Sequence, residues 1–154
     1  MVELLTLNQR VLGSNPSGKT NLDSMFENIK NSKKQGDTGM GYAIAYFSKL
    51  GWTVSIPITD SQDYDLVVDN GSNLLRVQVK TSKFKTSHGI YQVSLKTCGG
   101  NRSGQTIKKF DENSSDLLFV LLENGDIYLI PREDIKGSTS INLGVSMSKY
   151  KIVL

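Results

Sequence analysis

The 154-residue sequence has few of the residues that build covalent staples and metal clusters: one cysteine, one histidine and three prolines. Cys98 alone cannot form an internal disulfide bond or a cysteine-based zinc site. A Ser-His-Asp or Cys-His hydrolase would depend on His88, and the surrounding TSHGIY is typical of a turn. These absences argue against the commonest hydrolase sites and against a zinc domain.

Long apolar runs are also missing. No run approaches the roughly 18 residues of a membrane-spanning helix, and the N-terminus lacks the apolar segment of a signal peptide. We therefore expect a soluble, cytoplasmic protein with no membrane partner. The length predicts one domain over residues 21–154, which would bury about 70% of its unfolded surface. Residues 1–20 are predicted to form a peripheral or mobile arm.

A central stretch, YDLVVDNGSNLLRVQVK (residues 64–80), predicts two short strands that pair as a hairpin. DLVVD is apolar between two acids, and LLRVQVKTS alternates like a half-buried strand. Asn70-Gly71 lies between them as a hairpin turn signal. Because side chains alternate across a strand, Arg76, Gln78 and Lys80 should share one face of the second strand.

Pairing of these strands would bring Asp65 close to Gln78 and Lys80. The Asp65 carboxylate, the Gln78 amide oxygen and a strand carbonyl are oxygen ligands of the kind that Mg²⁺ prefers. Lys80 would position or help deprotonate a water molecule and balance charge at a phosphate. The alternative is a polar row that faces solvent, with Asp65 and Lys80 as a surface ion pair worth about 0–1 kcal/mol.

Around these residues the sequence resembles the PD-(D/E)XK nuclease superfamily. The strings GDTGMGYAIAYFSKLGWTVSIPITDSQDYDLVVD and RVQVKTS are most similar to its small intron-associated homing endonucleases, in which Gln replaces the acid of the last motif. The resemblance covers about Lys33 to Lys136. It implies a restriction-endonuclease-like α/β fold, with a mixed central β-sheet flanked by helices and the site at one sheet edge.

The resemblance also implies an activity: Mg²⁺-dependent, site-specific hydrolysis of phosphodiester bonds in double-stranded DNA. Asp65, Gln78 and Lys80 would be the catalytic residues, and Asp65 and Gln78 the metal ligands. One such site cuts one strand, so a double-strand break requires at least two subunits. We therefore expect the chain to pair with itself as a dimer or a tetramer.

One position departs from the family pattern. Superfamily members often carry a metal-linked Glu in a GDxGE-like segment, which here reads GDTGMG, with Met40 where that Glu is expected. Asp37, about one helical turn earlier, or Glu27, from a preceding helix, could supply the acid, or it is dispensed with. If its loss has disabled catalysis, the protein would be a DNA-binding module on a nuclease fold.

Positive charge is unevenly distributed. The net charge is only +3, but no acidic residue occurs between Asp69 and Asp111. Such a segment attracts the DNA backbone, although a charged run can also be a solvated surface. The glycine-rich loop at residues 98–109 is either a DNA-contacting segment or an ordinary long loop. The candidate DNA-binding residues are Lys33, Lys34, Arg76, Lys83, Lys85, Lys96, Asn101, Arg102, Gln105, Lys108 and Lys109.

Periodicity and turn signals predict the remaining elements. Helices are expected at residues 21–34, near 37–50 and at 131–135. Strands are expected at 52–58, 89–97, 116–123 and 126–130, the last two joined by a turn at Asn124-Gly125. The tail at 138–154 is a candidate final strand or partner contact.

The segment from Gly13 to Thr20, GSNPSGKT, matches the phosphate-loop pattern GxxxxGK[ST] in full. A working phosphate loop follows a buried strand, whereas the preceding LLTLNQRV is a poor central strand. A different account is that these codons overlap or derive from a transfer RNA gene, because GSNP can be encoded by the conserved arm near its 3′ end. A nucleotide-binding protein is therefore a further alternative, weaker than the nuclease.

Overall fold

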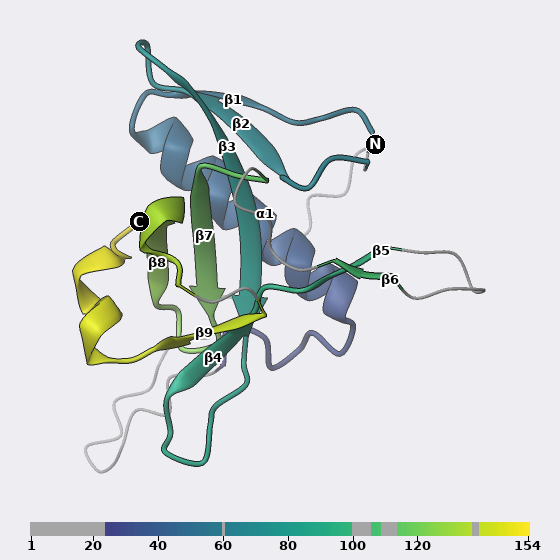
Figure 1. Ribbon diagram of the computed structural model, residues 1–154, viewed down its shortest axis with the longest axis vertical. Helices are drawn as coiled ribbons and strands as arrows, with labels where there is room; N and C mark the ends of the chain where they lie inside the picture. The colour runs from purple at the N-terminus through teal and green to yellow at the C-terminus, as the bar shows by residue number, and fades with distance from the viewer. Residues whose placement is uncertain (1–23, 60, 100–105, 109–113, 137–138) are drawn as a thin grey trace, which may run out of the picture.

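The computed structural model describes residues 24–59, 61–99, 106–108, 114–136 and 139–154 (Figure 1). The predicted arm at 1–20, including the phosphate-loop match, lies outside these residues, as does 100–105 of the glycine-rich loop. The described residues form a six-stranded sheet, one long helix, two two-stranded ribbons and two short 3₁₀ helices. No described helix is both long and apolar enough to cross a membrane.

The long helix, α1 (Ser32–Lys49), starts earlier than the predicted residue 37. Its N-terminus is set by Asn31, whose Oδ1 accepts a hydrogen bond from the Lys33 N–H at 2.8 Å. Its end follows the prediction: Gly51 has φ +75°, which glycine adopts without strain. The predicted helix at 21–34 is wrong for the described part, because residues 25–28 form a turn and Ser32 onward belongs to α1.

That turn is fixed by contacts distant in sequence. The Met25 N–H donates to the Glu123 carbonyl at 2.8 Å, and the Ser24 hydroxyl donates to Glu123 Oε1 at 2.8 Å. Phe26 of this turn is buried in the core. The segment therefore keeps its apolar anchor but not its helical form.

The main sheet has the strand order β1-β2-β3-β7-β8-β10. Its strands are β1 (Thr53–Ser55), β2 (Leu66–Asp69), β3 (Leu74–Ser82), β7 (Leu117–Leu122), β8 (Ile127–Pro131) and β10 (Lys151–Ile152). Strands β3 and β7 run parallel, whereas the other neighbours run antiparallel. The predicted mixed sheet and both predicted hairpins, β2–β3 and β7–β8, are confirmed.

The β2–β3 hairpin turns through a four-residue loop at 70–73, because Asp69 pairs with Leu74. Gly71 lies in this loop at φ +87°, and its N–H donates to Asp69 Oδ1 at 2.8 Å. Asn70 Oδ1 accepts hydrogen bonds from the Ser72 N–H at 2.9 Å and the Asn73 N–H at 2.8 Å. These local bonds set the register that places Asp65 opposite β3.

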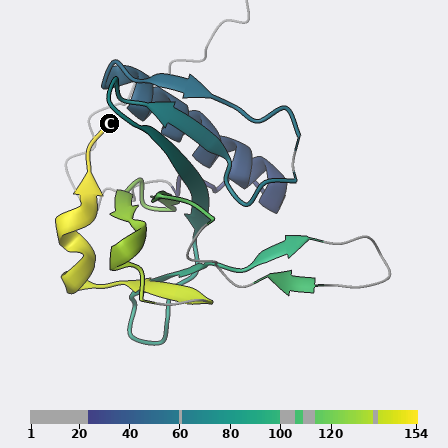
Figure 2. The same cartoon turned by 45° about the horizontal axis from the view of Figure 1, so that its top comes forward.

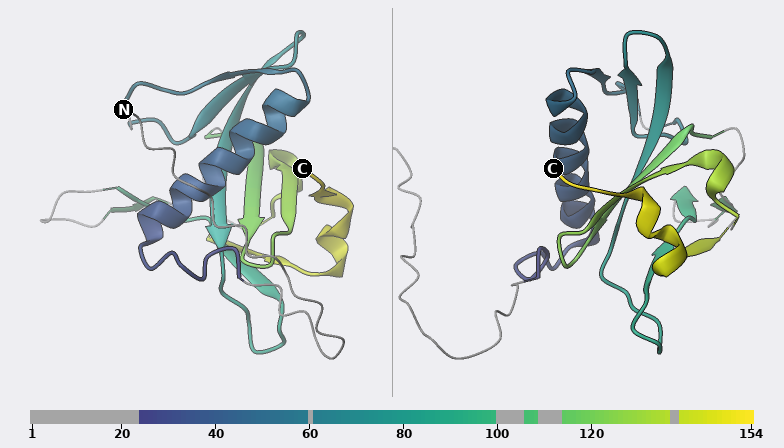
Figure 3. Two further views of the ribbon diagram at one scale, coloured as in Figure 1. Left: turned by 180° about the vertical axis from the view of Figure 1, so that it is seen from behind. Right: turned by 90° about the vertical axis from the view of Figure 1, so that its left-hand side faces the viewer.

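The two faces of the sheet are covered differently (Figure 3). Helix α1 packs on one face over an apolar core that includes Ala43, Phe47 and Phe119. The other face carries the ribbon β4 (Tyr91–Ser94)–β9 (Ser140–Leu143) and the 3₁₀ helices η1 (Arg132–Asp134) and η2 (Val145–Tyr150), over a second apolar core. The α/β prediction holds, but α-helix covers one face only in the described part of the chain.

Several predicted boundaries change. The strand expected at 52–58 is limited to β1, and the strand expected at 89–97 divides into β4 and the beginning of β5. Strands β5 (Thr97–Gly99) and β6 (Thr106–Lys108) pair as a ribbon that extends away from the body of the molecule (Figure 2). The expected loop at 98–109 therefore has strand at both ends. The tail forms β9, η2 and β10, and β10 closes the sheet against β8.

Candidate active site

The structure brings together the three predicted catalytic residues. Asp65 directly precedes β2, and its N–H donates to the Val77 carbonyl at 2.9 Å. Because Leu66 pairs with Val77, Asp65 lies opposite Gln78. The Asp65 Oδ2 atom also accepts a hydrogen bond from the Val79 N–H at 2.7 Å. The carboxylate is thus fixed at the edge of β3, where pairing with β2 stops.

Burial governs the charge of Asp65. Loss of solvent raises the pKa of its carboxyl above 3.8, and the Val79 hydrogen bond and the positive charge of Lys80 counteract this only in part. A charged Asp65 is therefore electrostatically under-compensated by its described neighbours. A cation next to it would favour the charged form.

Gln78 lies on the sheet face opposite α1, because Val77 and Val79 pack toward α1 and side chains alternate. It is only 3% exposed, so the alternative of a solvent-facing polar row is wrong for this residue. Its Oε1 atom is buried and has no hydrogen-bond partner among the described residues. An unsatisfied buried acceptor lowers the free energy of unfolding by about 1–3 kcal/mol, so this oxygen does not stabilise the fold.

These oxygens fit a hard cation. Asp65 offers a carboxylate and Gln78 an orphaned amide oxygen, and oxygen is the ligand atom that Mg²⁺ prefers. In the described part of the chain, no three His, Cys, Asp or Glu side chains come together. Any metal here would accordingly rest on one carboxylate, one amide and further oxygens from elsewhere.

The predicted substitutes for the missing acid, Asp37 and Glu27, are both exposed, and no three His, Cys, Asp or Glu side chains of the described residues form a group that could hold a metal. A role for either acid stays a prediction. Met40 is half-buried and packs against the core between α1 and the sheet. Sequence reasoning missed Gln35, whose Nε2 donates to Thr81 Oγ1 at 2.9 Å and so ties α1 to β3 beside Lys80.

Helix α1 approaches β3 unusually closely at Gly39. A Cβ atom built at this position would lie 2.5 Å from Thr81 Cγ2 and 3.3 Å from Val79 Cγ1. Glycine is therefore required for the observed packing. This approach holds the end of β3 that carries Lys80 against the helix.

The guanidinium of Arg76, a predicted DNA-binding group, pairs with Asp116. Arg76 Nη2 lies 3.0 Å from Asp116 Oδ1, and the Arg76 Nε and N–H groups both donate to Oδ2. The hydrogen bonds from Arg76 hold the pKa of the Asp116 carboxyl below its usual value. The pair links β3 to the start of β7, and a DNA contact by Arg76 stays a prediction.

The other predicted DNA-binding residues are spread over several elements. Lys33 and Lys34 are exposed in the first turn of α1, and Lys83, Lys85 and Lys96 are exposed around β4. Lys85 Nζ lies 4.6 Å from the centre of the Tyr91 ring. Lys108 is in β6, and the remaining candidates, Asn101, Arg102, Gln105 and Lys109, lie outside the described residues.

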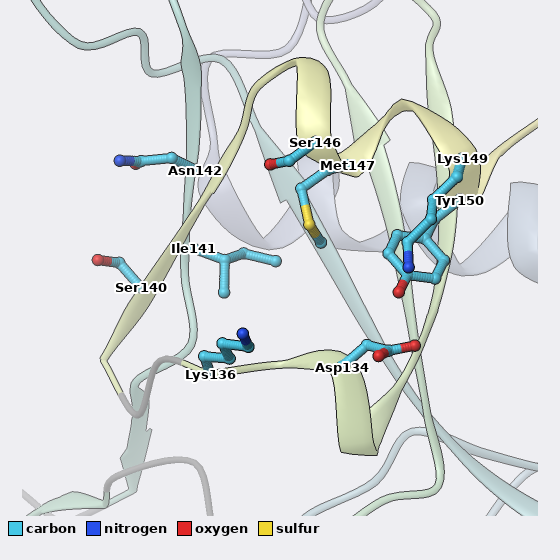
Figure 4. A pocket seen from close by; sticks show the side chains of 9 residues that line it. All are labelled: Asp134, Lys136, Ser140, Ile141, Asn142, Ser146, Met147, Lys149 and Tyr150. Atoms are coloured by element: carbon cyan, nitrogen blue, oxygen red, sulfur yellow. The ribbon is translucent and has the colours of Figure 1, made fainter.

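A pocket of about 420 Å³ opens between η1, β9 and η2 (Figure 4). Lys136 and Lys149 line it together with Met147 and Tyr150. The Lys149 Nζ atom lies 4.6 Å from the centre of the Tyr150 ring. None of the three predicted catalytic residues lines this pocket, so it is separate from the candidate active site.

The mixed sheet with a helix on one face is the α/β fold expected of a PD-(D/E)XK nuclease, and the family comparison agrees. The PD-(D/E)XK endonuclease family model matches residues 30–151, so the chain belongs to the PD-(D/E)XK endonuclease family. This confirms the resemblance to the PD-(D/E)XK nuclease superfamily.

Two individual proteins are similar to this chain. Protein 5.3 of Escherichia phage T7 is 32% identical over 104 residues, which cover 66% of this chain and 81% of that protein. The structure of a bacterial homing endonuclease, I-Ssp6803I, matches with a TM-score of 0.68 and 28% identity over 79% of this chain and 88% of that one. The chain is therefore similar to a homing endonuclease in both fold and sequence.

Proposed function

We propose that the protein is a Mg²⁺-dependent, site-specific endonuclease of the homing type, which hydrolyses phosphodiester bonds in double-stranded DNA. The family and the homing endonuclease relative support the reaction class. The observation that carries the proposal is Gln78 Oε1, a buried acceptor beside Asp65 and Lys80 that has no hydrogen-bond partner among the residues that the structure describes.

Each residue has a distinct role in this proposal. Asp65 and Gln78 would hold Mg²⁺, which supplies positive charge to the phosphate oxygens as negative charge develops there. The Val79 N–H fixes the orientation of the Asp65 carboxylate. Lys80 orients the attacking water and holds a proton at Nζ. The water oxygen forms a bond to phosphorus as the water gives up a proton to bulk solvent, the ester P–O bond breaks, and the leaving oxygen takes up a proton from solvent.

A library of supercoiled DNA targets in Mg²⁺ tests this proposal when both binding and cutting are measured. Wild-type protein should make discrete double-strand cuts. Lys80→Ala should abolish the cuts but still bind DNA, because removing one amine leaves the fold intact. Lys149→Ala is a charge-matched control and should cut normally, since Lys149 lines the pocket between η1, β9 and η2, which none of the three proposed catalytic residues lines. Cuts by Lys80→Ala at the wild-type rate would contradict the proposed site.

A double-strand break also implies that two copies act together. We infer a dimer or a tetramer with two-fold symmetry, because each chain carries one proposed site and the two DNA strands run in opposite directions. Sedimentation of the protein with and without a cut target would check the subunit count. A monomer that makes only single-strand nicks would contradict this part of the proposal.

A second candidate is a DNA-binding protein that has lost cleavage. Met40 favours it, because a core-packed methionine stands where the family often has a metal-linked acid. DNA binding with a steep salt dependence and no cuts in Mg²⁺ would support it. If DNA is neither bound nor cut, the match from Gly13 to Thr20 becomes the next hypothesis, tested by ATP binding that Lys19→Ala abolishes.

A further inference from the structure

A second pocket, of about 340 Å³, begins where β3 ends. The residues that line it include Thr81, Phe84, Ser94, Lys96, Thr139 and Ser140. The described lining residues contain one lysine, several hydroxyl groups and no carboxylate. A pocket of this size falls at the lower end of the roughly 300–1,000 Å³ typical of small-ligand sites.

The pocket adjoins the candidate active site. Successive residues of a strand are about 3.3 Å apart, so Ser82 lies about 7 Å beyond Lys80 along β3. Strand β2 pairs with β3 only as far as Val77. The next N–H at this edge of β3, that of Val79, donates to the Asp65 carboxylate. Backbone N–H groups alternate between the two edges of a strand, so the Thr81 N–H points to the same edge as the Val79 N–H, while the Thr81 side chain contacts Gln35 of α1. The pocket thus continues the open edge of β3 that starts at Asp65.

Phe84 provides a fixed aromatic surface at this pocket. Phe84 is 59% exposed. Its backbone is held on both sides, because the Phe84 N–H donates to Ser82 Oγ at 3.2 Å and its carbonyl accepts from the Gln92 N–H at 3.0 Å. Ser82 Oγ in turn donates to the Gln92 carbonyl at 2.6 Å. An exposed ring on a fixed backbone suits stacking against a nucleic acid base.

The opposite wall offers charge and hydroxyl groups. Ser94 pairs with Ser140 across the β4–β9 ribbon, and their side chains lie on the face opposite the buried Val93–Ile141 pair. Lys96 follows β4 at the same alternation and is exposed. A lysine with neighbouring hydroxyls supplies the positive charge and the hydrogen-bond donors that a phosphate group requires.

We propose that this pocket binds the nucleotide next to the scissile phosphate, with Lys96 at the phosphate of that nucleotide and the Phe84 ring against its base. The proposal rests on the proposed nuclease function and adds a substrate contact to it. It also implies that the base leaves its stack, which is least costly where the DNA is unpaired.

The first test measures binding without cleavage, in the absence of divalent metal. The probes are a short random-sequence duplex and a single-stranded oligothymidine. Lys96→Ala should lower the logarithmic salt slope on the duplex by about 0.9, the contribution of one phosphate, whereas Lys149→Ala should not. Phe84→Leu should weaken binding to the single strand about tenfold, and Phe84→Tyr should retain it, because stacking requires a ring. Both altered side chains are exposed, and thermal unfolding should be unchanged.

The second test places the pocket relative to the cut. In the target that the wild type cleaves, the phosphate adjoining the cut is replaced by a neutral methylphosphonate. The loss of affinity should be large in wild type and in Lys149→Ala but absent in Lys96→Ala, because that variant has already lost the same contact. A loss of equal size in all three proteins would overturn the assignment.

The outcomes separate this proposal from the nuclease function. Equal effects of Lys96→Ala and Lys149→Ala on the salt slope, or full retention of single-strand binding by Phe84→Leu, would overturn the pocket while cleavage stands. Predicted effects on binding without any cuts by wild type would support a nucleotide pocket but overturn its place beside a scissile phosphate. Absence of DNA binding by wild type would overturn both proposals.

Discussion

The two faces of β3 are both enclosed, but by different means. On one face, Val77 and Val79 pack into an apolar core beneath α1. On the other, Gln78 is as deeply buried as the core residues, yet its amide oxygen lacks a partner among the described residues. Packing accounts for the first face. It does not account for the second, because the described residues leave the Gln78 oxygen without a partner.

Substitution at Gly39 should give the largest effect, on the apolar face. Gly39→Ala would place a methyl carbon 2.5 Å from Thr81 Cγ2, and Thr81 is held by its bond from Gln35. We expect overpacking to lower the free energy of unfolding by about 1–3 kcal/mol, measured by urea denaturation.

Two glycines of the same helix serve as controls for this substitution. Nothing lies within 4 Å of a Cβ built at Gly36 or Gly41. Gly36→Ala and Gly41→Ala should therefore stabilise the protein by about 0.5–1 kcal/mol, as alanine does in an open helical position. If Gly39→Ala behaved like these two variants, the close contact between α1 and β3 would not constrain the fold.

On the polar face, removing the amide should stabilise the protein. Gln78→Leu replaces an unsatisfied buried acceptor by an apolar side chain of similar size, so we expect a gain of about 1 kcal/mol in urea denaturation. The same change should abolish any stabilisation by Mg²⁺. Gln92→Leu is the matched control, because Gln92 Nε2 donates to Asn142 Oδ1 at 2.9 Å and the substitution breaks that bond without relieving an orphan. A strong loss of stability in Gln78→Leu would show that Oε1 has a structural partner.

Much of the difference between the two faces of β3 could be predicted from the sequence. Alternation along LLRVQVK separates Val77 and Val79 from Gln78 and Lys80, and Asn70-Gly71 marks the hairpin that sets the register of Asp65. Local rules were sufficient here because the two strands are adjacent in the chain. The burial of Gln78 was not predictable, since it depends on β7 and on the second apolar core, which lie far along the sequence.

Long-range contacts also explain the wrong predictions. The segment at residues 25–28 has helical spacing of apolar residues, but hydrogen bonds to Glu123 hold it as a turn. The sequence placed Met40 at the expected position of the family acid, which stays a prediction. The packing of Met40 in the core and the contact between Gln35 and Thr81 could not be predicted, because both depend on how α1 lies on β3. Sequence periodicity does not determine which helix residue meets which strand residue.

The smallest expected effect separates charge from packing at Asp65. Burial raises the pKa of this carboxyl above 3.8, so the folded protein holds the proton more tightly than the unfolded chain. The resulting stabilisation is complete below pH 3.8 and is lost as the pH rises through the folded-state pKa. Asp65→Asn lacks this titration, so it should become more stable relative to wild type as the pH rises from below 3.8 to neutrality, measured by urea denaturation across that range. The opposite dependence from Asp116, whose pKa is lowered, is present in both proteins and cancels.

Mg²⁺ at neutral pH should stabilise wild type and not Asp65→Asn, because only the charged carboxylate gains from the cation. A stability difference that did not vary with pH would mean that Lys80 and the Val79 N–H compensate the buried charge in full, and the electrostatic argument for a cation at this site would fail.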